Sequence, residues 1–172
     1  TQTPAAPAKP TVTRPKAVRN VKAKATKKGI RITWKKVSGA SGYQIYRKTD
    51  SGKWTPIKTT KGTSYKDTKV KAGYKYTYTV RAYTKNKKTM SSYNKTGLSA
   101  VAGISTLKLS KSTLSVFAGS SYTLKVTGAK ISPKWSSSNT KVATVSSTGK
   151  VSGKKVGTAK ITAKLGGRTF TC

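Results

Sequence analysis

The sequence lacks most of the side chains that catalysis uses. Its 172 residues include no histidine, and the only acidic residues are Asp50 and Asp67. General acid–base catalysis needs positioned His, Asp or Glu, and metal sites combine several such ligands. Two carboxylates, each expected in a separate turn, meet neither need. We therefore expect a protein that is not an enzyme and that has no cofactor and no metal site.

Cysteine is also scarce, because Cys172 is the only one and no internal disulfide can form. We expect its thiol either to be buried at a strand end or to react between molecules. No apolar run approaches the roughly 20 residues of a membrane-spanning helix, so we expect no transmembrane segment. The chain begins with neither Met nor a signal peptide, and we interpret it as a piece of a larger secreted protein.

Positive charge, by contrast, is in large excess. Lys and Arg number 37 against two acidic residues, which gives a net charge of +35. Lysine dominates, and it acts as a point charge rather than as a bidentate reader of its ligand. This composition favours diffuse attraction to anionic cell-wall polymers, acidic glycans or phospholipid. High charge is also typical of disordered chains, but a regular strand pattern argues against disorder here.

Apolar and polar residues alternate in short stretches that are separated by turn residues, as in 30–34, 43–46 and 122–126. This pattern predicts an all-β fold of two tandem β-sandwiches. We expect a Pro/Thr/Ala-rich linker at 1–16, a first domain at 17–104 and a second at 105–172. The two domains should meet end to end with almost no linker.

The second domain carries a motif of spaced elements. They are Trp135-Ser-Ser-Ser-Asn139, Val142-Ala-Thr-Val145, Thr148-Gly-Lys-Val151 and Gly157-Thr-Ala-Lys-Ile161. In this order they resemble the signature of group 2 bacterial immunoglobulin-like domains. The resemblance implies a β-sandwich that serves as a spacer or adhesion module on the bacterial cell surface.

The first domain resembles a fibronectin type III domain. The resemblance rests on Trp34, on Gly42-Tyr-Gln-Ile-Tyr-Arg47, and on Gly73 three residues before Tyr76. It implies that Tyr76 is a tyrosine corner, whose hydroxyl bonds back to the backbone. Trp34 and Trp135 occupy inward positions and are expected in the two cores. No Arg-Gly-Asp tripeptide is present, so an integrin-binding loop has no support.

Alternation also predicts a candidate binding face on the first domain. If Tyr43 and Ile45 face the core, the residues between them face outward, and strand 75–83 alternates in the same way. Trp54, after a turn, is expected to be half exposed. The candidate face for an anionic ligand consists of Tyr46, Lys48, Trp54, Lys75, Arg81 and Tyr83. Rings beside cations can stack on sugars or bases, but the same residues could simply stabilise an exposed sheet.

Two functions remain open at this point. The first is a non-catalytic extracellular module pair of a larger bacterial surface or secreted protein, which contacts an anionic glycan or cell-wall polymer. Its other partners would be the remaining domains of the parent protein. The alternative is a polyanion or nucleic-acid binder without sequence specificity, because arginine is scarce and no reading helix or zinc motif is present.

Overall fold

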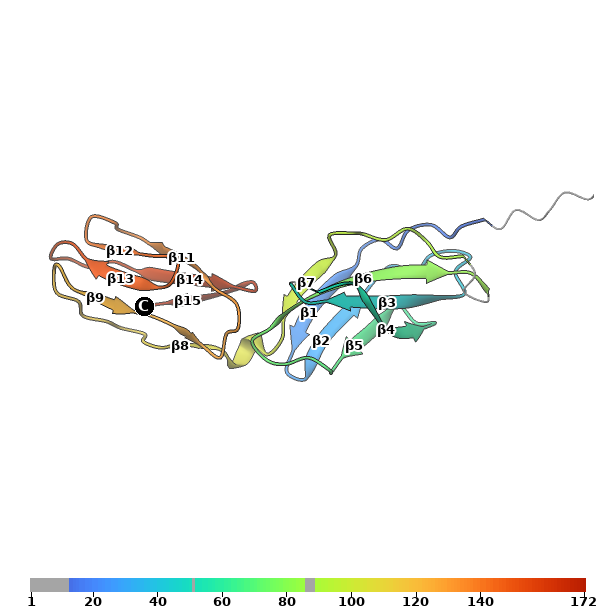
Figure 1. Ribbon diagram of the computed structural model, residues 1–172, viewed down its shortest axis with the longest axis horizontal. Coiled ribbons are helices and arrows are strands. Elements are labelled where there is room, and N and C mark those ends of the chain that lie inside the picture. The colour runs from blue at the N-terminus through green and yellow to red at the C-terminus, as the bar shows by residue number, and fades with distance from the viewer. Residues whose placement is uncertain (1–12, 51, 86–88) are drawn as a thin grey trace, which may run out of the picture.

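The computed structural model describes residues 13–50, 52–85 and 89–172. Within these ranges the chain forms β-strands and a 3-10 helix, η2 (Ile104–Thr106), with no α-helix. The strands build two β-sandwiches that lie end to end (Figure 1). The all-β fold that alternation predicted is therefore confirmed. Most of the expected linker, residues 1–12, lies outside the described residues.

The N-terminal sandwich contains seven strands in two antiparallel sheets. One sheet has the order β1-β2-β5 and the other β4-β3-β6-β7. The strands are β1 (Lys22–Thr26), β2 (Gly29–Thr33), β3 (Gly42–Lys48), β4 (Thr55–Thr60), β5 (Ser64–Asp67), β6 (Lys75–Tyr83) and β7 (Leu98–Val101). This division of seven strands into three and four is the arrangement of a fibronectin type III sandwich.

The core of this sandwich contains the inward residues that the alternation predicted. Ile45, Tyr78 and Val80 are almost completely buried. Trp34 is buried as well, and its ring meets Tyr43 edge to face with centroids 5.4 Å apart. The aromatic centre of the core is thus built by residues on both sheets or at their ends.

Tyr76 has the expected tyrosine-corner geometry. Its hydroxyl accepts a hydrogen bond from the backbone N–H of Lys71 at 3.0 Å. The bond ties the start of β6 to the loop that precedes it, and it confirms the role that the fibronectin type III resemblance implied for this residue.

The C-terminal sandwich has shorter strands. Its sheets have the orders β11-β14-β15, β12-β13-β9 and β10-β8. The strands are β8 (Lys108–Leu109), β9 (Ser121–Thr123), β10 (Val126–Thr127), β11 (Lys134–Ser137), β12 (Ala143–Val145), β13 (Lys150–Gly153), β14 (Ile161–Leu165) and β15 (Arg168–Thr171). Alternation over Thr158–Ala163 predicts a strand from Thr158 onward, but β14 begins only at Ile161. The alternating apolar residues Leu114 and Val116 likewise predict a strand, but they belong to no strand and have no ladder partner.

Trp135 joins the two parts of the second core. It is only half-buried, yet it packs against the cluster around Leu107 and Phe170 and also against the cluster around Leu124 and Val151. The expectation of an inward tryptophan is correct. The ring lies between two small clusters rather than inside one large core.

The two sandwiches meet directly around η2. Val101, at the end of β7, packs in one cluster with Leu107 and Phe170 of the second sandwich. The backbone N–H of Lys130 donates to the carbonyl of Gly73 at 3.0 Å. Apolar packing and a backbone bond therefore link the modules, and the chain bends where they join (Figure 1).

Candidate functional site

The candidate site lies on the outer face of the four-stranded sheet, where β3 and β6 run side by side. Their register pairs the outward residues in turn: Gln44 with Arg81, Tyr46 with Thr79, and Lys48 with Thr77. Directly opposed residues of an antiparallel pair are close enough to touch. The structure therefore places Tyr46, Lys48 and Arg81 on one face, as alternation indicated.

Trp54, which directly precedes β4, joins this face. The Lys48 Nζ atom lies 4.8 Å from the centroid of the Trp54 ring. The same ring meets Tyr93 edge to face at 6.4 Å, and the Arg81 guanidinium lies 5.4 Å from the centre of the Tyr93 ring. We call Lys48, Trp54, Tyr93 and Arg81 the cation–aromatic cluster. Each cation–π contact in it contributes about 0.5–1 kcal/mol at an exposed site.

A small cavity of about 80 Å³ opens at this cluster. Its lining consists of Tyr46, Trp54, Thr79, Arg81 and Tyr93. Cavities that enclose a whole small molecule measure roughly 300–1,000 Å³. The site can therefore receive one small group of a larger ligand, which would otherwise lie along the face.

Hydrogen bonds fix Arg81 and Tyr46 on this face. Arg81 donates from Nε to the carbonyl oxygen of Ser91 at 2.8 Å. Ser91 is fully buried, and its hydroxyl oxygen accepts the backbone N–H of Ala82 at 3.0 Å. The Tyr46 hydroxyl donates to Gln44 Oε1 at 2.9 Å. Two of the side chains that line the cavity, Tyr46 and Arg81, are thus held in place before a ligand arrives.

The open face that the alternation suggested is in fact covered. Thr77 and Thr79 point outward from β6, yet they are only 5% and 2% exposed. The chain between β6 and β7 crosses this face, and Gly97 comes so close that an added Cβ would lie 2.6 Å from Trp54 and 2.8 Å from Thr77. The centre of the sheet surface at Thr77 and Thr79 is therefore buried, whereas residues around it, the cation–aromatic cluster among them, still reach solvent.

Two of the predicted face residues lie outside the cluster. Lys75, at the start of β6, forms an ion pair with Asp50 at 2.6 Å. Tyr83, at the end of β6, stands opposite Gly42 with its hydroxyl over that glycine. The structure brings together Tyr46, Lys48, Trp54 and Arg81, whereas Lys75 and Tyr83 flank them at opposite ends of the strand.

Sequence reasoning missed Tyr93. It lies in the stretch Ser91-Ser-Tyr-Asn94, which has no alternation and belongs to no strand. Its isolated aromatic side chain among polar residues was a weak signal. Only the path of the connection over the sheet places it between Trp54 and Arg81.

We expected Asp67 to lie in a turn. Instead it is the last residue of β5, and it is only 1% exposed. Its Oδ2 accepts bonds from Arg47 Nη1 and from the Tyr78 hydroxyl, both at 2.9 Å. Burial, followed by the nearby Asp67 charge, raises the pKa of Tyr78. Every polar contact of the carboxylate is directed into the protein, so this network stabilises the sandwich and offers nothing to a substrate.

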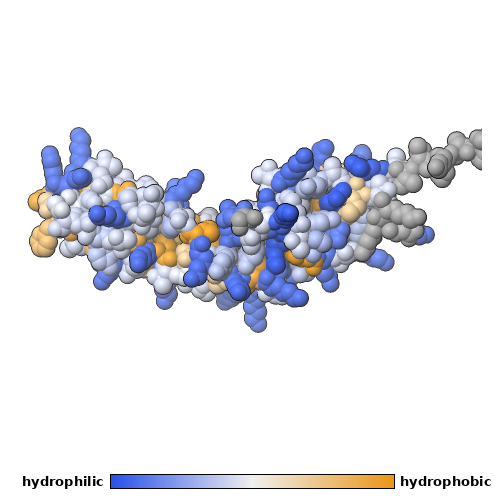
Figure 2. Space-filling view, in the orientation of Figure 1, coloured by the Kyte–Doolittle hydropathy of each residue, from blue (hydrophilic) through white to orange (hydrophobic). Residues whose placement is uncertain are grey.

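In the described part of the chain, no three His, Cys, Asp or Glu side chains come together as metal ligands. Helices long and apolar enough to span a membrane are likewise absent from those residues. Strongly hydrophilic side chains project from both sandwiches on the face shown in Figure 2. The cation–aromatic cluster is thus the most organised polar feature on the surface of the first module.

The fold and this surface define a tandem of β-sandwich modules. Residues 104–170 match the family model described as bacterial Ig-like domain (group 2). The match confirms, for this segment, the resemblance that the motif in the sequence indicated. Group 2 bacterial Ig-like domains occur in bacterial surface proteins, and both module types are non-catalytic by class.

Several solved structures share partial similarity with the chain. One is designated FN3tt, at 22% identity over 53% of this chain and 97% of that chain, with a TM-score of 0.46. Another is a Fn3-like protein from Clostridium thermocellum, at 26% identity over 52% and 92%, with a TM-score of 0.39.

A third similar structure is a β-1,2-glucanase from Parabacteroides distasonis, at 27% identity with a TM-score of 0.45. The alignment covers 56% of this chain but only 14% of the glucanase. No curated protein matches the chain.

Proposed function

We propose that the chain is a non-catalytic pair of extracellular modules in a bacterial surface or secreted protein. It spaces or displays the other domains of that protein, and its first module contacts an anionic glycan or cell-wall polymer. The observation that carries the binding part is the cation–aromatic cluster, in which Lys48 and Arg81 alternate with Trp54 and Tyr93.

The chemistry of the cluster suits a charged sugar polymer. An aromatic ring can stack on the apolar face of a sugar while a neighbouring cation pairs with a carboxylate, sulfate or phosphate on the same chain. The cavity beside Tyr46 adds room for one substituent. The spacer role is supported by the direct packing of Val101 against the second sandwich, which limits bending between the modules.

The alternative is a polyanion binder, for example of nucleic acid, that uses only its net charge of +35. Such binding arises from counterion release and depends on the number of neutralised phosphates, not on any one lysine. The two functions therefore predict different responses to single substitutions.

The experiment compares Lys48→Gln with Lys66→Gln in binding to heparin, teichoic acid and double-stranded DNA across a salt series. Lys66 is an exposed strand residue on the opposite sheet. Each variant loses one positive charge, so the comparison tests whether the position of that charge matters. For a site at the cluster, Lys48→Gln weakens binding to the preferred polymer severalfold and reduces the salt slope by about 1. Trp54→Ala weakens it further, because a stacked ring is worth about 1–3 kcal/mol.

Equal losses in Lys48→Gln and Lys66→Gln, for every polymer, would assign the binding to diffuse charge. Failure of the unmodified protein to bind any of the three polymers at low salt would remove adhesion and leave the spacer role.

A further inference from the structure

Thr79, on β6, carries a buried hydroxyl that the described part of the chain leaves without a hydrogen-bond partner. Thr77, two residues earlier on the same strand, is almost as buried, but its hydroxyl bonds to that of Ser99 at 2.8 Å. A buried hydroxyl costs free energy unless water or a ligand atom bonds to it. The hydroxyl of Thr79 is therefore available to a ligand, whereas that of Thr77 is already engaged.

The same threonine lines the cavity of about 80 Å³ at the cation–aromatic cluster. Trp54 and Tyr93 contribute aromatic rings to the lining, and Tyr46 stands opposite Thr79 in the β3–β6 ladder. The Tyr46 hydroxyl donates its proton to Gln44 Oε1, so its oxygen can only accept a further bond. The cavity thus offers one hydrogen-bond donor, one acceptor and aromatic surface.

A neutral acetamido group matches these features. Its carbonyl oxygen can accept from Thr79, its N–H can donate to Tyr46, and its methyl group can pack on an aromatic ring. A water molecule takes up about 30 Å³ in the liquid, so a cavity of about 80 Å³ holds such a group but not a sugar ring. Lys48 and Arg81 lie beside the cavity, where they disfavour an amine and attract an acidic group.

We propose that the cation–aromatic cluster recognises an acidic polysaccharide that contains N-acetylated sugars. This inference rests on the proposed function of the first module and narrows its ligand. The acetamido group occupies the cavity, and a carboxylate, sulfate or phosphate of the same polymer pairs with Lys48 and Arg81. Arg81 is already positioned by the bond from its Nε to the Ser91 carbonyl, which leaves its two Nη nitrogens for the acidic group.

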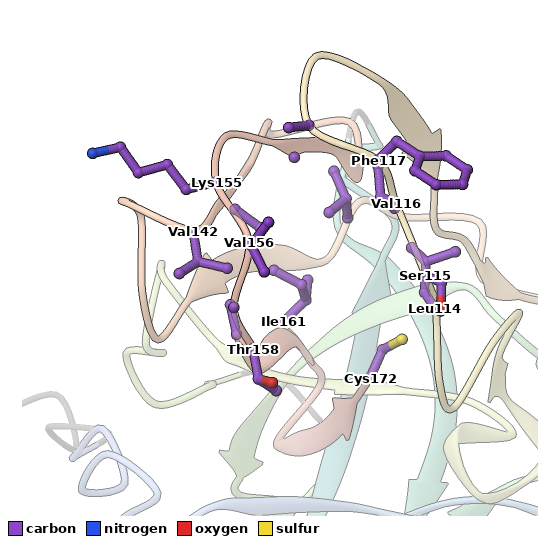
Figure 3. Close-up of a pocket in the computed structure, with 16 residues that line it drawn as sticks. Leu114, Ser115, Val116, Phe117, Val142, Lys155, Val156, Thr158, Ile161 and Cys172 are labelled. Carbon is purple, nitrogen blue, oxygen red and sulfur yellow. The ribbon is translucent and has the colours of Figure 1, made fainter.

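A larger cleft in the second sandwich lacks this combination of groups. It measures about 430 Å³, and Figure 3 shows Val142, Val156 and Ile161 gathered in it beside Cys172. Lys155 is the only charged residue among those that line the cleft, and neither Trp nor Tyr is among them. This cleft therefore offers neither the pair of cations nor the tryptophan that an acidic sugar would meet at the cluster.

The test compares two oligosaccharides of equal charge, whose binding to the whole chain is measured by calorimetry. One alternates glucuronate with N-acetylglucosamine, and the other alternates glucuronate with glucose, so that only the acetamido group differs. We expect the first to bind about tenfold more tightly, the scale of a hydrogen bond together with a buried methyl group. An N-butyryl form of the first should bind no better than the second, because the longer acyl chain exceeds the cavity.

Thr79→Val removes the hydroxyl and keeps the branched shape of the side chain. It should weaken binding of the acetylated oligosaccharide about fivefold, the scale of one hydrogen bond, and leave binding of the other unchanged. Thr77→Val is the matched control, because Thr77 is buried on the same strand but does not line the cavity. It should leave the preference for the acetylated oligosaccharide intact.

Three results would overturn the inference. Equal binding of the two oligosaccharides, with both weakened by Lys48→Gln, would do so and leave the proposed binding face in place. A preference that Thr79→Val does not reduce would place the acetamido group outside the cavity. If neither oligosaccharide binds at low salt, the inference fails, and the polymer series with Lys48→Gln and Lys66→Gln decides the proposed function separately.

Discussion

Asp67 shows how one buried side chain organises a strongly basic module. Its Oδ2 accepts the Arg47 guanidinium and the Tyr78 hydroxyl, and its Oδ1 accepts the backbone N–H of Lys69 at 3.0 Å. Arg47 also donates to the Lys69 carbonyl at 2.7 Å. Each donor faces a partner, so removing the carboxylate leaves several polar groups unpaired at once.

We expect Asp67→Asn to lower the free energy of unfolding of the first module by about 3 kcal/mol, the scale for breaking a buried pair. Asp50→Asn is the control. Asp50 is 56% exposed in its pair with Lys75, and exposed pairs contribute about 0–1 kcal/mol. Urea unfolding followed by fluorescence measures both, and equal effects would show that burial does not matter at Asp67.

Because Tyr78 is buried, we expect the first module to lose stability at alkaline pH. Burial raises its pKa in the folded protein above the ordinary value near 10, so the folded state keeps a proton that the unfolded state releases. The unfolded state then binds fewer protons, and stability falls as pH rises above about 10.

Between pH 9 and 11, the unmodified protein should lose more unfolding free energy than Tyr78→Phe, which cannot ionise at this position. The comparison cancels the titration of the lysines, which both proteins share. Parallel pH profiles would contradict the assignment to Tyr78.

At the scale of elements, the connection between β6 and β7 determines whether the outer face is open. Gly97 has a φ of 71° and lies against Trp54, Thr77 and the Tyr78 carbonyl. Gly39 has the same φ of 71° but has no heavy atom within 4 Å of an added Cβ. The two glycines share a left-handed backbone conformation, which glycine adopts without strain, and differ in the space around them.

Gly97→Ala should therefore destabilise the first module more than Gly39→Ala. A left-handed conformation costs a non-glycine residue on the order of 1–2 kcal/mol in both variants, and only Gly97→Ala adds a clash that displaces Trp54. We expect a shifted Trp54 emission in Gly97→Ala alone. Equal destabilisation with unchanged emission would mean that the connection is free to move.

The sequence predicted which residues of each strand face the core better than it predicted what covers the outer face of the sheet. Alternation correctly placed Tyr43, Ile45, Tyr78 and Val80 in the core, because a strand period directly assigns each residue to a face. It could not show that Thr77 and Thr79 are buried, because their cover comes from a connection with no periodic pattern. The cation–aromatic cluster was predictable for Lys48 and Arg81, but not for Tyr93.

The second sandwich shows a related limit of predicting strands from the sequence. The motif around Trp135 identified the family, yet the alternating apolar residues Leu114 and Val116 predicted a strand where the chain is extended and unpaired. Pairing depends on a neighbouring edge, which the residues themselves do not specify.

At the scale of the whole molecule, the contacts at the junction hold the two sandwiches together, whereas the positive charge on both sandwiches favours their separation. Arg168 Nη1 donates to the carbonyls of Ile104 and Leu107, both at 2.8 Å, and Val101 packs into the second core. These contacts hold two strongly basic modules together, although like charges on both favour separation. Rigidity of the pair should therefore depend on ionic strength.

Added salt should raise the melting temperature of the protein. A net charge of +35 repels itself in the compact state, and only two ion pairs, Arg47–Asp67 and Lys75–Asp50, offset it among the described residues. Between 0.01 M and 0.15 M sodium chloride the screening length falls from about 30 Å to about 8 Å, which removes repulsion across a module. A gain of 1 kcal/mol corresponds to roughly 4–8 °C for a module of this size. Calorimetry over this range, with chloride as the only anion, measures the shift. A melting temperature that stays flat or falls would show that the lysines are spaced too widely for their repulsion to destabilise the folded state.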